Sequence, residues 1–193
     1  MSSNTAAKTP ANTTTKTRMM VQIAMLTAVA EVLMLFDFPL PFAPSFYKID
    51  LSEVPILIGC FAMGPAAGII IEAMKILLNF IISGTVTAGV GELANFAIGC
   101  SMVLPAGLIY RYHKTRKNAV LGMAAGTLVM AAIGGLLNAF VLLPAYAALF
   151  GGMDAIIGMG TAVNKNITSV QSFVLLSVVP FNLVKGVIVS LVT

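Results

Sequence analysis

Long apolar runs separated by short polar breaks fill the sequence from about residue 18 onward. A helix needs roughly 20 mainly apolar residues to cross a bilayer, and most of these runs approach or exceed that length. A membrane barrel would instead alternate apolar and polar side chains over segments of about ten residues. The pattern therefore predicts an all-α integral membrane protein, a six-transmembrane-helix bundle with spans at about 19–36, 52–63, 66–82, 92–110, 119–150 and 170–193.

Prolines and glycines mark the ends of several spans. Three prolines within 37–50 forbid a continuing helix, so this segment is expected to be an extended loop near a surface. Ser52 is predicted to cap the second span, since Pro55 is tolerated in a first helical turn. Gly64 and Pro65 should end that span. The fifth span, 119–150, is so long that we expect it to be tilted, kinked or partly a segment beside a loop.

Composition agrees with this assignment. Hydrophobic residues make up 59% of the chain and charged residues 9%, and the mean hydropathy of +0.99 is far above that of soluble domains. We expect one transmembrane domain over 18–193, preceded by a disordered polar tail over 1–17. Cys60 and Cys100 lie in apolar runs without metal-ligand spacing, so we interpret them as small buried hydrophobic residues.

The positions of Lys and Arg predict the orientation, because cytoplasmic loops retain these residues. Basic residues precede the first span, and RYHKTRK at 111–117 joins the fourth span to the fifth. Both termini should therefore be cytoplasmic and the 37–50 loop external. The net charge of +4 follows from this topology and requires no nucleic acid partner.

Polar side chains recur inside the apolar runs at helical spacing. Glu72, Lys75 and Asn79 share one helix face, and similar pairs occur in later spans. Charged groups at membrane depth cost at least a few kcal/mol unless they are paired or hydrated, so they usually face the bundle interior. The remaining members of this set, which we expect to converge on a shared space, are Glu92, Asn95, Asn138, Asn182 and Lys185.

Two interpretations of these polar groups follow. They are structural ion pairs that fix helix register, or they surround a polar ligand with hydrogen-bond donors and acceptors. The mixture of acids, bases and amides favours the ligand. The sequence has no phosphate-binding loop, metalloprotease motif or nucleophile elbow, so we expect no enzyme, no metal site and an energy source outside this chain.

Pairs of small residues four apart predict close helix contacts in lipid. Ala24 and Ala28 form such a pair in the first span, and Gly122 and Gly126 form another in the fifth.

Several separated motifs carry a family resemblance. LMLFDFPLPFAPSFYKIDLSEVPILIGCFAMGPAAGIIIEAMKILLNF, GELANFAIG, LNAFVLLPAY and VVPFNLVKG occur in order along the chain. Together they resemble the riboflavin-specific substrate-binding subunit, or S component, of energy-coupling factor (ECF) transporters. The resemblance covers the chain from about Thr17 to its end. One departure is the end at Val192–Thr193, where the family usually continues into a basic cytoplasmic segment, so the C-terminus is expected to be incomplete.

The resemblance implies a multi-pass protein of the bacterial cell membrane that binds riboflavin from outside and topples to release it inward. It implies assembly with a transmembrane coupling subunit, which Ala24 and Ala28 would contact, and with two cytoplasmic ATPase subunits. Riboflavin would be the transported ligand, and no cofactor is expected. The resemblance leaves open whether FMN also binds.

The resemblance also implies a set of ligand-binding residues. The loop with Phe42, Ala43 and Tyr47 would close over the flavin. Glu72, Lys75 and Asn79 match a family motif, but whether they contact ligand or form a structural network stays open. The other positions implied for the ligand are Glu92, Asn95, Asn138, Asn182 and Lys185, with Tyr146 and Phe181 as candidates for packing against the ring.

Two alternatives come from other functional classes. A stand-alone, proton-coupled secondary transporter of a small polar solute would use Glu72 or Glu92 as its titrating group. Such transporters usually contain inverted repeats, and the sequence shows no convincing internal symmetry. A purely structural membrane subunit would bind no ligand.

Overall fold

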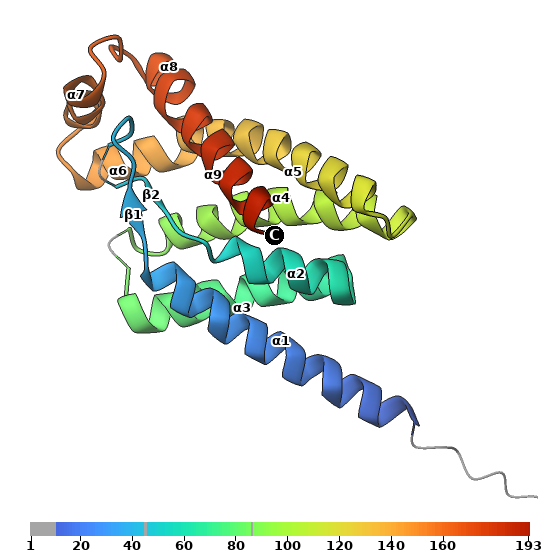
Figure 1. Cartoon of the computed structure of the whole chain (residues 1–193). Helices are drawn as coiled ribbons and strands as arrows, with labels where there is room; N and C mark the ends of the chain where they lie inside the picture. Colours follow the sequence, from blue (N-terminus) through green and yellow to red (C-terminus); the bar gives the residue numbers. More distant parts are fainter. Residues whose placement is uncertain (1–10, 45, 86) are drawn as a thin grey trace, which may run out of the picture.

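The computed structural model describes residues 11–44, 46–85 and 87–193. Helices dominate it, and a short hairpin of two antiparallel strands lies at one end (Figure 1). In chain order the elements are α1 (Ala11–Leu35), β1 (Phe38–Pro39), β2 (Lys48–Ile49), α2 (Glu53–Met63), α3 (Pro65–Ser83), α4 (Val90–Tyr112), α5 (Arg116–Leu137), the π-helix η1 (Asn138–Leu142), α6 (Leu143–Leu149), α7 (Met153–Val163), α8 (Val170–Phe173), the π-helix η2 (Val174–Val178) and α9 (Val179–Val192).

Five helical stretches within the described residues are long and apolar enough to cross a bilayer. They are Thr15–Leu35, Pro65–Ser83, Val90–Tyr112, Arg116–Leu149 and Val170–Val192. These stretches confirm the prediction of a helical membrane protein. The second predicted span, 52–63, is not among them, because α2 is apolar but has 11 residues, or roughly 16 Å of helix.

The boundary of the N-terminal tail differs from the predicted one. Helix α1 begins at Ala11, so residues 11–17, which the sequence assigned to the tail, belong to the helix. The rest of the predicted tail lies outside the described residues.

The turn between α2 and α3 forms where the sequence predicted it. Gly64 has a φ of 103°, a left-handed value that suits glycine, and Pro65 begins the next helix. The predicted cap at Ser52 is wrong, because its side chain makes no capping hydrogen bond. The Ser52 hydroxyl instead donates to the Asp50 carboxylate and accepts a hydrogen bond from Lys75.

The long fifth span continues without a break through α5, η1 and α6, and its irregularity is a π-helical turn. The amide of Leu143 donates to the carbonyl of Asn138, five residues back. A proline in a helix clashes with the carbonyl four residues before it, and the wider turn before Pro144 provides room for the ring. The same arrangement recurs in η2 before Pro180, where Val179 donates to Val174.

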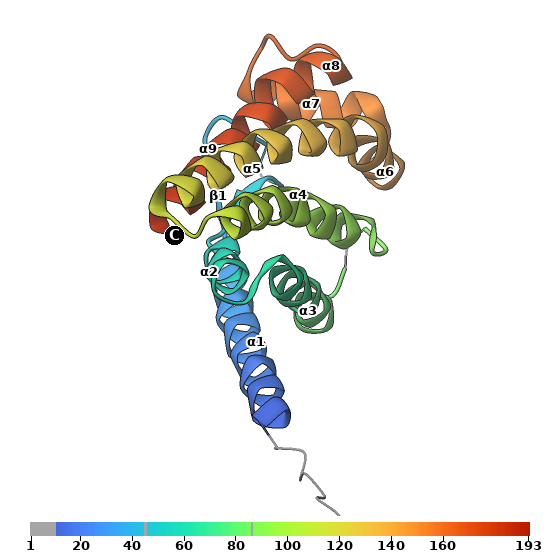
Figure 2. The same cartoon turned by 90° about the vertical axis from the view of Figure 1, so that its right-hand side faces the viewer.

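Close helix packing holds α4 against α5, which lie side by side in Figure 2. A Cβ atom on Gly122 would lie 2.7 Å from the Ala106 carbonyl oxygen, and one on Gly126 would lie 2.5 Å from the Met102 oxygen. The small pair predicted in the fifth span therefore lies at a helix contact. Beside it, buried residues such as Leu57, Ile71 and Met102 form an apolar core among α1–α5 and α9.

A second apolar cluster joins the hairpin loop to the later helices. Tyr47 and Ile49 pack there with Leu143, Phe173 and Phe181. The hairpin loop is therefore fixed against α6, α8 and α9, above the space between the two clusters.

Candidate ligand-binding site

A cavity of about 530 Å³, which we call the chamber, lies beneath the hairpin loop. Its wall is built from the hairpin, the ends of α1 and α3, the beginning of α4, and the η1, α6 and α9 segments. Polar and aromatic side chains mix in this wall. The predicted site residues that line it are Tyr47, Asn79, Glu92, Asn95, Asn138, Tyr146, Phe181, Asn182 and Lys185.

Tyr47 and Asn138 connect the hairpin loop to the π-helical turn. The Tyr47 hydroxyl donates to the Asn138 Oδ1 atom, and Asn138 Nδ2 donates to the Gly134 carbonyl at 2.7 Å. Both side chains are buried. Burial raises the pKa of Tyr47, so the phenol stays neutral and keeps its proton for this bond. The wider turn at η1 places the Asn138 amide in the chamber wall.

Asn182 contributes a second buried amide from α9. Its Nδ2 atom donates to the Val178 carbonyl at 2.9 Å. A Cβ atom on Gly134 would lie 2.9 Å from that same Nδ2 atom, so only a glycine at this point of α5 leaves room for the amide. The η1 and α9 segments thus hold the two amides, Asn138 and Asn182, beside each other in the wall.

Glu92 and Asn95 line the chamber from the beginning of α4. The Thr87 hydroxyl donates to Glu92 Oε2 at 3.2 Å and accepts the Gly91 backbone amide at 2.9 Å. This loop threonine therefore fixes the carboxylate at the first turn of α4. Asn95 lies one turn further along the same helix and lines the same cavity.

Aromatic rings cover another part of the wall. Phe46 and Tyr47 have ring centroids 4.7 Å apart, and Tyr47 lies 5.3 Å from Phe181. Phe46 also meets Tyr146 edge-on at 5.6 Å. These distances are typical of favourable aromatic pairs, and the rings offer flat apolar surface to a planar ligand.

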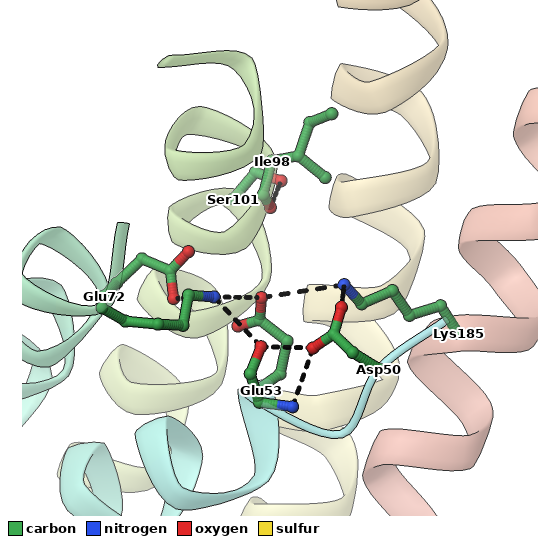
Figure 3. Close-up of polar contacts among 8 residues, drawn as sticks. Asp50, Glu53, Glu72, Ile98, Ser101 and Lys185 are labelled. Atoms are coloured by element: carbon green, nitrogen blue, oxygen red, sulfur yellow. Dashed lines mark hydrogen bonds and ion pairs between the residues drawn. The ribbon is translucent and has the colours of Figure 1, made fainter. Parts of the chain in front are cut away.

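A buried network of charges begins in the chamber wall and extends away from it (Figure 3). Lys185 Nζ lies 3.2 Å from Asp50 Oδ2 and 4.0 Å from Glu53 Oε1. Glu53 is in turn 3.2 Å from Lys75 Nζ, which pairs with Glu72 at 2.9 Å. We call this set the charged cluster; its members are Asp50, Ser52, Glu53, Glu72, Lys75 and Lys185.

Only the first part of the charged cluster faces the chamber. Asp50 and Lys185 line the cavity, whereas the side chains of Glu53, Glu72 and Lys75 are buried behind it among α2, α3 and α4. Glu72 Oε1 points at Gly99 on α4, where a Cβ atom would lie 2.3 Å away. The structure therefore places Glu72 and Lys75 in a network that supports the wall.

Asp50 is compensated by its neighbours in this buried position. Its carboxylate lies 3.2 Å from the Lys185 ammonium group and accepts hydrogen bonds from the Ser52 amide and hydroxyl. Asp50 thus holds the Lys185 ammonium group at the chamber surface.

The remaining predicted residues lie in different places. Asn79 lines the chamber and donates to Glu31 of α1 at 3.2 Å. Phe42 and Ala43 do not line it: Ala43 packs in the apolar cluster with Tyr47, and the Phe42 side chain is 37% exposed. Ala24 and Ala28 are exposed on α1.

Sequence reasoning missed several residues of the wall. Phe46, Asp50 and Thr87 line the chamber, as do Asp37 and Lys48, whose side chains pair at 3.1 Å across the base of the hairpin. The sequence signal for Asp50 was a carboxylate directly before a predicted span, a position that also suits an ordinary surface loop. In the part of the chain that the structure describes, no group of three His, Cys, Asp or Glu side chains is placed to hold a metal ion.

Comparison with known proteins gives consistent matches over nearly the whole chain. The family model of the ECF transporter substrate-specific component matches residues 18–193. Riboflavin transporter RibU of Staphylococcus aureus is 35% identical over 90% of this chain and 85% of its own length. Riboflavin transporter FmnP of Bacillus subtilis is 33% identical over 92% of this chain and 88% of its own length. A solved S component of a bacterial ECF transporter has 36% identity and a TM-score of 0.73, covering 92% of this chain and 91% of that one.

Proposed function

This chain belongs to the family of substrate-specific components of ECF transporters, and from that premise we propose that its chamber binds riboflavin for uptake across the cell membrane. The observation that carries the proposal is the similarity, at 35% identity over 90% of the chain, to a riboflavin transporter. A proton-coupled transporter that works alone has no comparable support. In this proposal riboflavin is the transported ligand and not a resident cofactor.

The chemistry of the chamber suits this ligand. Its volume of about 530 Å³ lies within the roughly 300–1,000 Å³ that is usual for small-molecule sites. The flavin ring has an edge of alternating carbonyl and imide groups, which the Asn138 and Asn182 amides can match as donors or acceptors. Tyr146 and Phe181 would pack against the ring faces. The hydroxyls of the ribityl chain would bind near Glu92, Asn95 and Lys185.

The hairpin loop would act as the cover of the site. Tyr47 in this loop donates a hydrogen bond to Asn138, and Ala43 packs in the same apolar cluster as Tyr47. Phe42 would contact the flavin only if the loop rearranged around the ligand.

We propose six spans, with α2 and the segment before it acting together as the second. Irregular backbone is tolerated at membrane depth where protein covers it, and Asp50 and Ser52 are both buried. The hairpin lies at the end of the molecule opposite to the basic α4–α5 turn (Figure 1). The rule that cytoplasmic loops are basic then puts that turn and both termini in the cytoplasm and the hairpin outside.

The energy for uptake would come from other subunits. The family implies a transmembrane coupling subunit and two cytoplasmic ATPase subunits. Ala24 and Ala28 are exposed on α1 and would contact the coupling subunit, since small residues permit close helix approach.

Titration of the purified protein with riboflavin tests the proposal. We expect quenching of flavin fluorescence that saturates at one flavin per chain at micromolar concentrations or below. Absence of quenching would contradict the function. Riboflavin uptake into liposomes driven by a pH gradient, without ATPase subunits, would instead support the stand-alone transporter.

A further inference from the structure

A second cavity, of about 440 Å³, lies away from the chamber. Three segments build it: the end of α2 with the Gly64 turn, the beginning of α3, and the end of α4. We call it the basic cavity. It is lined by residues 60–66, Gly107, Tyr110, Arg111 and Lys114.

The two cavities lie at opposite ends of α4. Glu92 and Asn95, near the start of this helix, line the chamber, whereas Tyr110 and Arg111, near its end, line the basic cavity. With 23 residues, α4 is roughly 35 Å long, close to the thickness of a bilayer core. The basic cavity is therefore at the membrane interface on the side of the α4–α5 turn.

The wall of the basic cavity combines apolar and cationic surface. The rings of Phe61 and Tyr110 pack with centroids 4.8 Å apart, as aromatic residues often do at a membrane interface. Arg111 and Lys114 are exposed at the rim, and neither forms an ion pair with any residue that the structure describes. The chain has seven Asp and Glu residues in all, and none of them belongs to this wall.

The backbone adds a weaker preference for anions. Helix α3 begins in this wall at Pro65, and no side chain caps its first turn. The N-terminal end of a helix carries a partial positive charge. Two uncompensated cationic side chains and this helix end thus border one apolar recess.

We propose that the basic cavity binds the phosphate headgroup of an anionic phospholipid from the adjacent leaflet. Arg111 and Lys114 would hold the phosphate, and Phe61 and Met63 would contact the glycerol and the first acyl carbons. Free inorganic phosphate would use only the rim, whereas a lipid also fills the apolar recess. Basic pockets between membrane helices are known to bind anionic headgroups. This proposal does not depend on riboflavin binding.

Native mass spectrometry of the full-length protein, titrated with phosphatidylglycerol or phosphatidylcholine, tests the proposal. We expect phosphatidylglycerol to be retained in preference to phosphatidylcholine. In the double variant Arg111→Gln/Lys114→Gln that preference should fall by roughly 5-fold for each basic side chain removed. The matched control is Arg116→Gln/Lys117→Gln, which removes the same charge at the beginning of α5, outside the cavity. Ala66→Trp, which fills the cavity without changing its charge, should also reduce retention.

Several results would overturn the proposal. Equal retention of the two lipids would show that the cavity does not select an anionic headgroup. Equal losses in the cavity variant and the control would show that general surface charge attracts the lipid. Full displacement by inorganic phosphate would make the ligand a free anion. Unchanged lipid retention with loss of co-purifying coupling subunit would make the cavity a protein-docking surface. The thermal unfolding midpoint of each variant in detergent verifies that it is folded.

Discussion

Asn138 and Tyr47 lie 91 positions apart in the chain, and they meet at the boundary between the hairpin loop and the chamber. The asparagine has two roles there. It presents an amide to the cavity, and it accepts the hydrogen bond that holds Tyr47 in the loop.

A comparison of Asn138→Ala with Tyr47→Phe separates these roles. We expect Asn138→Ala to weaken riboflavin binding by roughly 1–3 kcal/mol, because a buried polar partner is lost on both the ligand and Tyr47. Tyr47→Phe removes only the hydroxyl and should cost less if Asn138 contacts the flavin directly. Fluorescence quenching measures both affinities, with Asn164→Ala, far along the chain in a surface loop, as the control. Unchanged affinity in Asn138→Ala would remove this residue from the site.

Lys75 compensates the charges of two buried carboxylates, those of Glu53 and Glu72. Lys75→Met should lower the free energy of unfolding by about 3–5 kcal/mol, because both carboxylates would stay buried without their common partner. Adding Glu72→Gln should recover part of this loss. The thermal unfolding midpoint in detergent measures the effect.

The control for Lys75 is Lys48→Met. Lys48 pairs with Asp37 at a largely exposed position, and such pairs contribute about 1 kcal/mol or less. Equal midpoints for the two single variants would contradict the assignment of Lys75 as the centre of the charged cluster.

At the scale of elements, the contact between α4 and α5 depends on the absence of side chains. Gly126→Ala would bring a methyl group to 2.5 Å from the Met102 carbonyl oxygen, so the helices must separate. We expect a loss of roughly 1–3 kcal/mol, measured as a lower unfolding midpoint. In Gly158→Ala of α7, nothing lies within 4 Å of the new atom, so this control should be neutral or slightly stabilising. A similar midpoint for both variants would contradict close packing at Gly126.

The long helices could be predicted from the sequence because the bilayer requires continuous apolar runs, and α3, α4 and the fifth span lie where those runs are. Two features could not be predicted from the sequence: helix α7 and the π-helical turns. The segment Met153–Val163 is apolar but only 11 residues long, so its pattern did not distinguish α7 from a loop. The π-helical turns depend on how Pro144 and Pro180 are accommodated in three dimensions, which helical periodicity does not reveal.

At the scale of the whole molecule, α1 presents an exposed small-residue face. Ala24→Leu/Ala28→Leu should reduce co-purification with the coupling subunit and leave riboflavin affinity unchanged, because the face lies outside the chamber. Ala132→Leu makes the same change at an exposed position of α5 and should leave assembly intact. Intact assembly in the double variant would exclude this face as the contact.

The candidate site could be predicted where polar residues interrupt apolar helices, as at Asn138, Asn182 and Lys185. It could not be predicted where the residue lies in a loop. Asp50 follows a proline-rich segment in which a carboxylate is ordinary, and its partner Lys185 is 135 positions away. The fold also divides one predicted motif: Asn79 faces the cavity, whereas Lys75 turns into the charged cluster.

The order of residues along α4 limits the path that a bound ligand can take through the molecule. Glu92 and Asn95 belong to the chamber, Met102 and Val103 to the close-packed apolar core, and Tyr110 and Arg111 to the far interface. The close-packed core thus lies between the chamber and the far interface of α4. A ligand that moved along α4 from the chamber to that interface would have to pass this core, so we expect release on that side to require repacking of the core or reorientation of the whole molecule.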